Sequence, residues 1–197
     1  MSPSAALLLA AGEARRFGAP KLLLPFGEGT VIGSVVAALG AAGVAPIVVV
    51  AGAQAEEIAA ALGEAARVVR NPDPSRGMVS SVQVGVAALP EGVGSFFIAL
   101  GDQPRVRAAD LLAMRAAQEQ SGKGLVMPTY RGKRGHPVLV SGRYREEILR
   151  LTEEQTLRDF LHAHFEDTLE VACESDAVIS DIDTREQYEH ERRKSRK

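Results

Sequence analysis

The chain has 197 residues and a formal net charge of −2, with 46% hydrophobic and 24% charged residues. This composition supports one folded domain and excludes extensive disorder. The near-neutral charge argues against general nucleic-acid binding, because that function needs a basic face to displace counterions. The single cysteine, Cys173, excludes an intrachain disulfide and a cysteine-rich zinc site. Because the sequence has no signal-peptide pattern and no run of about 20 apolar residues, we expect a soluble, cytoplasmic protein with no membrane partner.

The first half of the chain alternates short apolar runs with segments of helical spacing. The apolar runs predict strands at residues 5–10, 46–51, 67–69 and 95–100. The helical patterns between them predict helices at residues 31–42, 56–62 and 79–89. Strands that alternate with helices in this way indicate right-handed β-α-β units and a parallel sheet.

The second half continues with a predicted helix at residues 108–120 and a strand at 124–127. The stretch TYRGKRGHPVLVSG then predicts a loop or hairpin added to the main sheet. Helices at 145–151 and 156–164, strands at 168–173 and 177–182, and a polar C-terminal helix complete the prediction. The expected fold class is α/β, a Rossmann-like three-layer sandwich with a mostly parallel sheet. We expect one domain at residues 1–190 and a basic, disordered tail at 191–197.

The loop after the first strand carries glycines and cations where an α/β sheet binds its ligands. Gly12 permits close backbone approach, while Arg16 and Lys21 are suited to phosphate oxygens. The spacing matches neither a P-loop, in which four residues separate the glycines, nor a G-x-G-x-x-G dinucleotide fingerprint. On spacing alone, a phosphate site and a solvated loop with clustered charges remain alternatives.

Two further loops follow predicted strands. In GDQPR, Asp102 ends a buried strand and would supply the hard oxygen that Mg²⁺ prefers, or it would simply cap the next helix. In the segment 70–86, Gly77, Ser80, Ser81 and Gly85 give one helix a narrow side that a ring or sugar can approach. Close packing of this helix on the sheet explains the small residues equally well.

Taken in order, these segments resemble a known family. LAAGEARRFGAPK resembles the L-A-A-G-x-x-x-R-x-G-x-x-K signature of nucleotidyltransferases, and GMVSSVQVG resembles their G-M-x-S-S segment. GDQP, GHPV and SDIDTREQY resemble their metal-binding turn, acceptor-side segment and C-terminal stretch. The set is most similar to the molybdenum cofactor cytidylyltransferase group of the MobA-like transferases, whose fold is of the nucleotide-diphospho-sugar transferase type.

The resemblance implies roles for individual residues. The backbone of Leu9, Ala10, Ala11 and Gly12 would hold the base, with Ser81 near the base or ribose. The triphosphate would be bound by Arg16 and Lys21, which with Asp102 form the expected catalytic set. Asp102 and Asp181 would ligate Mg²⁺, with Asp183 as the alternative to Asp181, and Gln103 and His136 would face the acceptor.

The implied reaction transfers CMP from CTP to the terminal phosphate of a molybdenum-pterin cofactor and releases pyrophosphate. GTP as donor, or a sugar phosphate or phospholactate as acceptor, is the nearest alternative. A non-catalytic carrier of nucleotide or cofactor is the alternative from another class. The implied partners are the nucleoside triphosphate, a phosphorylated pterin-type acceptor, and a molybdoenzyme or its chaperone.

Overall fold

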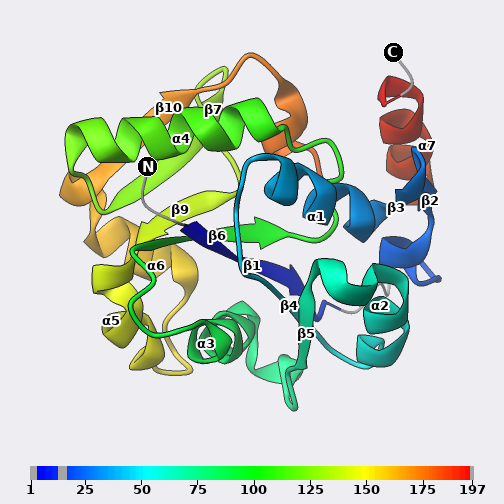
Figure 1. Cartoon of the computed structure of the whole chain (residues 1–197), viewed down its shortest axis with the longest axis horizontal. Coiled ribbons are helices and arrows are strands. Elements are labelled where there is room, and N and C mark those ends of the chain that lie inside the picture. The colour runs from blue at the N-terminus through cyan, green and yellow to red at the C-terminus, as the bar shows by residue number, and fades with distance from the viewer. Residues whose placement is uncertain (1–3, 13–16, 196–197) are drawn as a thin grey trace.

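The fold is organised around one eight-stranded mixed sheet (Figure 1). In this computed structural model, which describes residues 4–12 and 17–195, seven strands follow the order β10-β7-β9-β6-β1-β4-β5, and β8 pairs with β7. The strands are β1 (Ser4–Ala10), β4 (Ile47–Ala51), β5 (Arg67–Arg70), β6 (Ser95–Leu100), β7 (Leu125–Tyr130), β8 (Lys133–Arg134), β9 (Val138–Ser141) and β10 (Thr168–Ala172).

Most neighbouring strands are parallel. β1 pairs in parallel with β4 and β6, β4 with β5, and β7 with β10, whereas β9 runs antiparallel between β6 and β7. The predicted hairpin is therefore the insertion that places β8 and β9 in the sheet. The expectation of a mostly parallel sheet is confirmed.

Helices cover both faces of the sheet and form the outer two of three layers (Figure 1). On one face lie α1 (Val31–Ala41), α2 (Ala55–Leu62), α4 (Ala108–Ser121) and α7 (Arg185–Lys194), and on the other α3 (Met78–Ala88), α5 (Arg145–Leu149) and α6 (Leu157–Ala163). In β1, Leu8 faces the first helical layer and Leu7 the second, and both are fully buried. Burial on two sides explains why this strand is continuously apolar.

Helix α3 packs unusually close to the sheet. A Cβ atom at Gly85 would lie 2.9 Å from side-chain carbons of both Leu7 and Val50. Close packing of the helix on the sheet therefore explains Gly85. This was one of the two explanations that the sequence left open for the small residues of α3. Ser81, one turn nearer the start of α3, is buried at the same face of the helix and borders a cavity described below.

The predicted strand at residues 177–182 is wrong. The chain instead forms a 3-10 helix, Asp176–Ile179, followed by an extended but unpaired segment. Local side-chain bonds favour this turn: the Ser175 hydroxyl accepts from the Ala177 amide, and the Ser180 hydroxyl donates to the Asp176 carbonyl. Val178 and Ile182 are still buried, which explains the apolar pattern, but among residues 4–12 and 17–195 this segment pairs with no strand.

Two smaller features also differ from the sequence prediction. A short hairpin, β2 (Pro25–Phe26) with β3 (Gly29–Thr30), was not predicted and turns at Gly27, whose φ is 58°. Helix α7 extends to Lys194, so residues 191–194 are helical rather than part of a disordered tail, and Glu191 is buried. In the part of the chain that is described, no helix has the length and apolarity needed to cross a membrane.

Candidate active site

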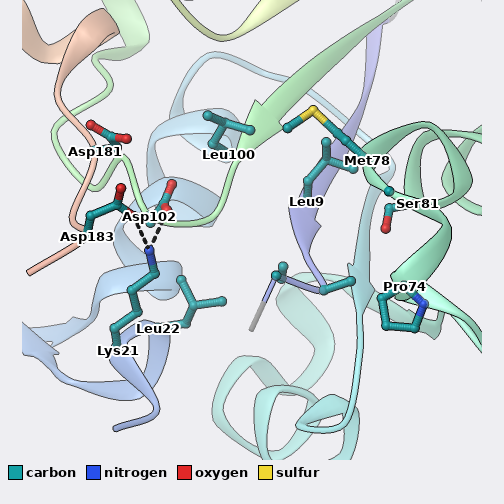
Figure 2. Close-up of a pocket in the computed structure, with 14 residues that line it drawn as sticks. Leu9, Lys21, Leu22, Pro74, Met78, Ser81, Leu100, Asp102, Asp181 and Asp183 are labelled. Atoms are coloured by element: carbon teal, nitrogen blue, oxygen red, sulfur yellow. Dashed lines mark hydrogen bonds and ion pairs between the residues drawn. The ribbon is translucent and has the colours of Figure 1, made fainter. Parts of the chain in front are cut away.

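A cavity of about 380 Å³ opens where β1 and β6 end (Figure 2). Its position is the expected one, because the loops after parallel strands converge at the carboxyl edge of a sheet. One end of the cavity is polar and the other is mainly apolar. The polar end is lined by Lys21, Asp102, Asp181 and Asp183; the rest of the lining includes Leu9, Ala10, Ala11, Gly12, Leu22, Pro74, Gly77, Met78, Ser81 and Leu100.

Lys21 holds the polar end together. Its Nζ donates to Asp102 Oδ2 at 2.7 Å and to Asp183 Oδ1 at 3.2 Å (Figure 2). It also donates to the carbonyl of Ile182 at 2.6 Å. The Lys21 side chain is only 12% exposed. One ammonium thus bridges two carboxylates that lie far apart in the sequence.

Backbone and cap contacts fix the two carboxylates. Asp102 follows β6, and its carbonyl accepts from the amide of Ile182 at 3.0 Å. Asp183 precedes α7, whose first turn has a capping box: Thr184 accepts from the Gln187 amide, and the Gln187 side chain accepts from the amides of Asp183 and Thr184. The start of α7 is therefore rigidly placed beside the end of β6.

The two candidates for the second metal ligand, Asp181 and Asp183, differ in their contacts. Asp183 shares Lys21 with Asp102, whereas Asp181 lines the same cavity but is exposed, and within the described residues it makes no bond to Lys21. The prediction that Asp181 ligates a metal stays a prediction. Asp183 is the carboxylate that Lys21 links directly to Asp102.

The polar end suits a divalent cation that arrives with phosphates. Among residues 4–12 and 17–195, no group of three or more His, Cys, Asp or Glu side chains forms a self-sufficient metal site. Mg²⁺ commonly binds through one or two carboxylates and completes its shell with water and substrate phosphates. The pair Asp102 and Asp183, already bridged by the cationic Nζ of Lys21, fits that mode of binding.

The other end of the cavity suits a flat ring. Leu9, Leu100, Pro74 and the half-exposed Met78 supply apolar surface, and Ser81 adds a hydroxyl. The segment from Leu9 to Gly12 forms part of the wall, and its role in holding a base stays a prediction.

Two further expected site residues, Gln103 and His136, do not line this cavity. Gln103 is buried with 5% exposure and does not line the cavity. His136 is not a lining residue either; its Nδ1 is buried and has no hydrogen-bond partner among the described residues. Burial lowers the pKa of His136. The Ile98 backbone and the charges of Asp102 and Asp181 act in the opposite direction, because they favour the protonated ring. Arg16 lies outside the described residues.

Sequence reasoning missed Arg105, which stabilises the segments that carry the polar end of the cavity. Its guanidinium is 13% exposed and contacts Glu191 of α7, Asp176 Oδ1 at 2.7 Å and Ser180 Oγ at 3.2 Å. Lys194 adds a bond of 2.6 Å to Asp176. The cluster ties the loop that carries Asp102 to the segment and helix on either side of Asp183. An arginine in a strand-end loop predicts no particular partner, so no sequence signal marked this role.

Replacing Arg105 with methionine should lower the free energy of unfolding by about 2 kcal/mol, because Glu191 and Asp176 each lose a charge-assisted hydrogen bond. Lys194 remains near both carboxylates and limits the loss. Urea denaturation measures the effect. Arg150→Met is the control: the Arg150 pair with Glu146 is exposed, and its loss should cost less than about 0.5 kcal/mol. Equal stability of the two variants would contradict a structural role of Arg105.

Acid should destabilise the protein through two carboxylates. The Lys194 and Arg105 bonds lower the pKa of Asp176 from 3.8 to about 2. Burial alone would raise the pKa of Asp167, but bonds from Tyr144 and Arg143 bring it to about 2. Because both pKa values are lower in the folded state, their stabilisation is present above about pH 4 and is lost as the pH falls toward 2. Denaturation at stepped pH should show this loss, and Asp176→Asn should flatten it; an unchanged slope would refute the role of Asp176.

Residues 6–168 match the model of the MobA-like NTP transferase domain. The chain is 27% identical over 191 residues to the molybdenum cofactor cytidylyltransferase of Escherichia coli (strain K12), with 95% of each chain covered. It is 30% identical over 189 residues to the nicotine blue oxidoreductase of Paenarthrobacter nicotinovorans, with 92% of each covered.

A solved structure shows the same fold. The manganese complex of Rv0371c from Mycobacterium tuberculosis H37Rv superposes with a TM-score of 0.79 at 26% identity, over 96% of this chain and 97% of that one. The Rossmann-like α/β fold expected from the sequence is thereby confirmed. Since the family model matches residues 6–168, most of the sequence, the chain belongs to the MobA-like NTP transferase family.

Proposed function

We propose that this nucleotidyltransferase moves a CMP moiety from CTP to the terminal phosphate of a molybdenum-pterin cofactor and releases pyrophosphate. The observation that carries the proposal is the two-ended cavity: apolar walls with a hydroxyl at one end, and Lys21 between two carboxylates at the other. A nucleoside triphosphate has the same polarity, with a flat base at one end and charged phosphates at the other. The similarity to the E. coli cytidylyltransferase supports CTP and the pterin acceptor.

In the proposed reaction, a terminal phosphate oxygen of the acceptor forms a bond to the α-phosphorus of CTP. The bond from that phosphorus to the bridging oxygen breaks, and pyrophosphate leaves with the electron pair. The protein contributes position and charge rather than covalent chemistry. Mg²⁺, held by Asp102 with Asp181 or Asp183, would offset charge on the phosphates.

The chain's own residues have separate parts in this scheme. Lys21 would release one carboxylate and neutralise the phosphates, because its flexible stem carries a compact charge. The Leu9–Gly12 backbone and Met78 would enclose the base. His136 has a lowered pKa and would face the acceptor as a neutral imidazole.

A pyrophosphate-release assay tests the proposal. The four nucleoside triphosphates are each paired with a molybdenum-pterin acceptor and with sugar phosphates, in the presence of Mg²⁺. CTP with the pterin acceptor should be fastest. Faster turnover with GTP, or with a sugar phosphate, would overturn the assignment of substrates, and binding of CTP without pyrophosphate release from any pair would favour the non-catalytic carrier.

A further inference from the structure

Helix α7 holds the chain on both sides of Lys21. Lys21 begins a short 3-10 helix, Lys21–Leu23, that lies outside the main sheet. Phe17 precedes this helix and Pro25 follows it, and both contact Tyr188 of α7. Figure 1 shows α7 alongside β2, the strand that begins at Pro25. One side chain of α7 therefore joins the two ends of the segment that presents Lys21 to the cavity.

The contacts at the two ends of this segment differ in kind. The Tyr188 hydroxyl donates to the carbonyl of Pro25 at 2.6 Å. The Tyr188 ring meets the Phe17 ring edge-on, with centroids 6.3 Å apart and planes at 87°. Arg185 lies one helical turn before Tyr188, and its guanidinium carbon is 5.7 Å from the centre of the Phe17 ring. Phe17 and Tyr188 are 5% and 8% exposed, so these contacts are largely shielded from water.

The charged end of Lys21 is held by the residues that lead into the same helix. Its Nζ donates to the Ile182 carbonyl and to Asp183 Oδ1, and the capping box of α7 fixes the backbone there. The lysine stem is flexible and loses much rotamer entropy when it is ordered. Its ammonium therefore keeps one position only if the backbone of Lys21 and the partners of Nζ are fixed relative to each other. Tyr188 provides that link, because it ties the backbone segment to the helix that follows Asp183.

We propose that Tyr188 is a positioning residue for the transfer reaction: it holds the segment 17–25 against α7, so that the Lys21 ammonium meets the triphosphate at a fixed place. This inference rests on the proposed function, in which Lys21 neutralises the phosphates. Tyr188 does not line the cavity, so it acts through Lys21 rather than on the substrate.

Tyr188→Phe tests this role, because it removes the hydroxyl and keeps the ring. Pyrophosphate release, measured with a nucleotide and acceptor that the unmodified protein turns over, should slow about tenfold, since small displacements of a group at a reacting centre cost that much or more. Tyr144→Phe is the matched control. Tyr144 is similarly buried, at 9% exposure, and its hydroxyl donates to Asp167, but it packs on the opposite face of the sheet. Each variant should lower the melting temperature by about 2–4 °C, whereas only Tyr188→Phe should slow the reaction.

A combination of variants distinguishes positioning of Lys21 from a general structural role. In a chain that already carries Lys21→Met, Tyr188→Phe should change the rate by less than about twofold, because the group that it positions is gone. Two substitutions that act independently would instead multiply their effects on the rate.

Mn²⁺ binding to the nucleotide-free protein provides a readout that requires no turnover. The ammonium of Lys21 would compete with a metal ion for Asp102 and Asp183. A less firmly held ammonium should therefore let Mn²⁺ bind about twofold more tightly in Tyr188→Phe. Tyr144→Phe should leave Mn²⁺ binding unchanged.

The outcomes separate this inference from the proposed function. If the unmodified protein releases pyrophosphate with none of the nucleotide and acceptor pairs, the proposed function fails and Mn²⁺ binding alone decides the inference. An unchanged rate in Tyr188→Phe, an equal slowing in Tyr144→Phe, or a further loss of about tenfold on top of Lys21→Met would overturn the positioning role. Mn²⁺ binding that is unchanged or weaker in Tyr188→Phe would overturn it as well. Should Tyr188→Phe fail to fold, Phe17→Leu breaks the ring contact from its other side and should produce the same slowing and the same gain in Mn²⁺ affinity.

Discussion

Replacing Asp102 with alanine is expected to slow pyrophosphate release about 100-fold while leaving the protein folded, because a preorganised charge at such a site typically contributes about 3 kcal/mol to lowering the barrier. Asp102 makes two separable contacts, one through its carboxylate and one through its backbone carbonyl. Its carboxylate faces the cavity and Lys21, whereas its carbonyl holds the Ile182 amide. The substitution removes the first and keeps the second, so the rate should fall without a large loss of stability.

Asp102→Asn is the matched variant, since it keeps the shape of the side chain and removes only the charge. It should lose as much activity as Asp102→Ala, whereas recovery of most of the rate in Asp102→Asn would show that hydrogen bonding rather than charge matters. Initial rates across a Mg²⁺ titration, with thermal unfolding alongside, make the comparison. Unchanged turnover in both variants would remove Asp102 from the mechanism.

The same titration ranks the two remaining carboxylates. Asp183 shares Lys21 with Asp102, and Asp181 is exposed at the cavity rim. If Asp183 is the second ligand, Asp183→Ala should raise the Mg²⁺ concentration required for half-maximal rate more than Asp181→Ala does. The reverse order would support Asp181 as the second ligand, as the family resemblance implies.

The placement of the site was predictable because it depends on rules that act locally. The apolar run of β1 is buried on both faces, and strands of that kind point their following loops to one edge of a parallel sheet. That rule alone brings Gly12, Ser81 and Asp102 toward a common cavity. Their segments are short and bounded by glycine or proline, so few alternative arrangements existed.

What the sequence did not reveal depends on pairing between distant segments. The apolar pattern at Val178 and Ile182 predicted a strand. Backbone hydrogen bonds from His136 to Val178 and from Ile182 to Asp102 replace strand pairing there. Arg105 gave no signal, because an arginine after a strand has meaning only through the partners the fold supplies. The sequence likewise did not show which of Asp181 and Asp183 the fold brings to Lys21.

The polar end of the cavity is balanced by its own lysine. Asp102 and Asp183 would repel each other at close range, and the Nζ of Lys21 between them offsets that repulsion. A divalent cation that binds the same carboxylates must compete with this ammonium. In the proposed reaction, a bound triphosphate would relieve this competition, because its oxygens would give Lys21 another partner as the cation arrives.

Replacing Lys21 with methionine should therefore have two opposite effects. Mn²⁺, used as a spectroscopic probe, should bind the nucleotide-free protein several-fold more tightly, since Asp102 and Asp183 lose their competing cation. With CTP present, pyrophosphate release should slow about 100-fold, because the charge that neutralises the phosphates is gone. Lys123→Met, which removes a lysine that bonds only to the Glu166 carbonyl among the contacts described, is the control and should change neither quantity. Weaker Mn²⁺ binding in Lys21→Met would show that Lys21 supports the cation site instead of competing for it, and an unaltered rate would exclude Lys21 from neutralising the leaving pyrophosphate.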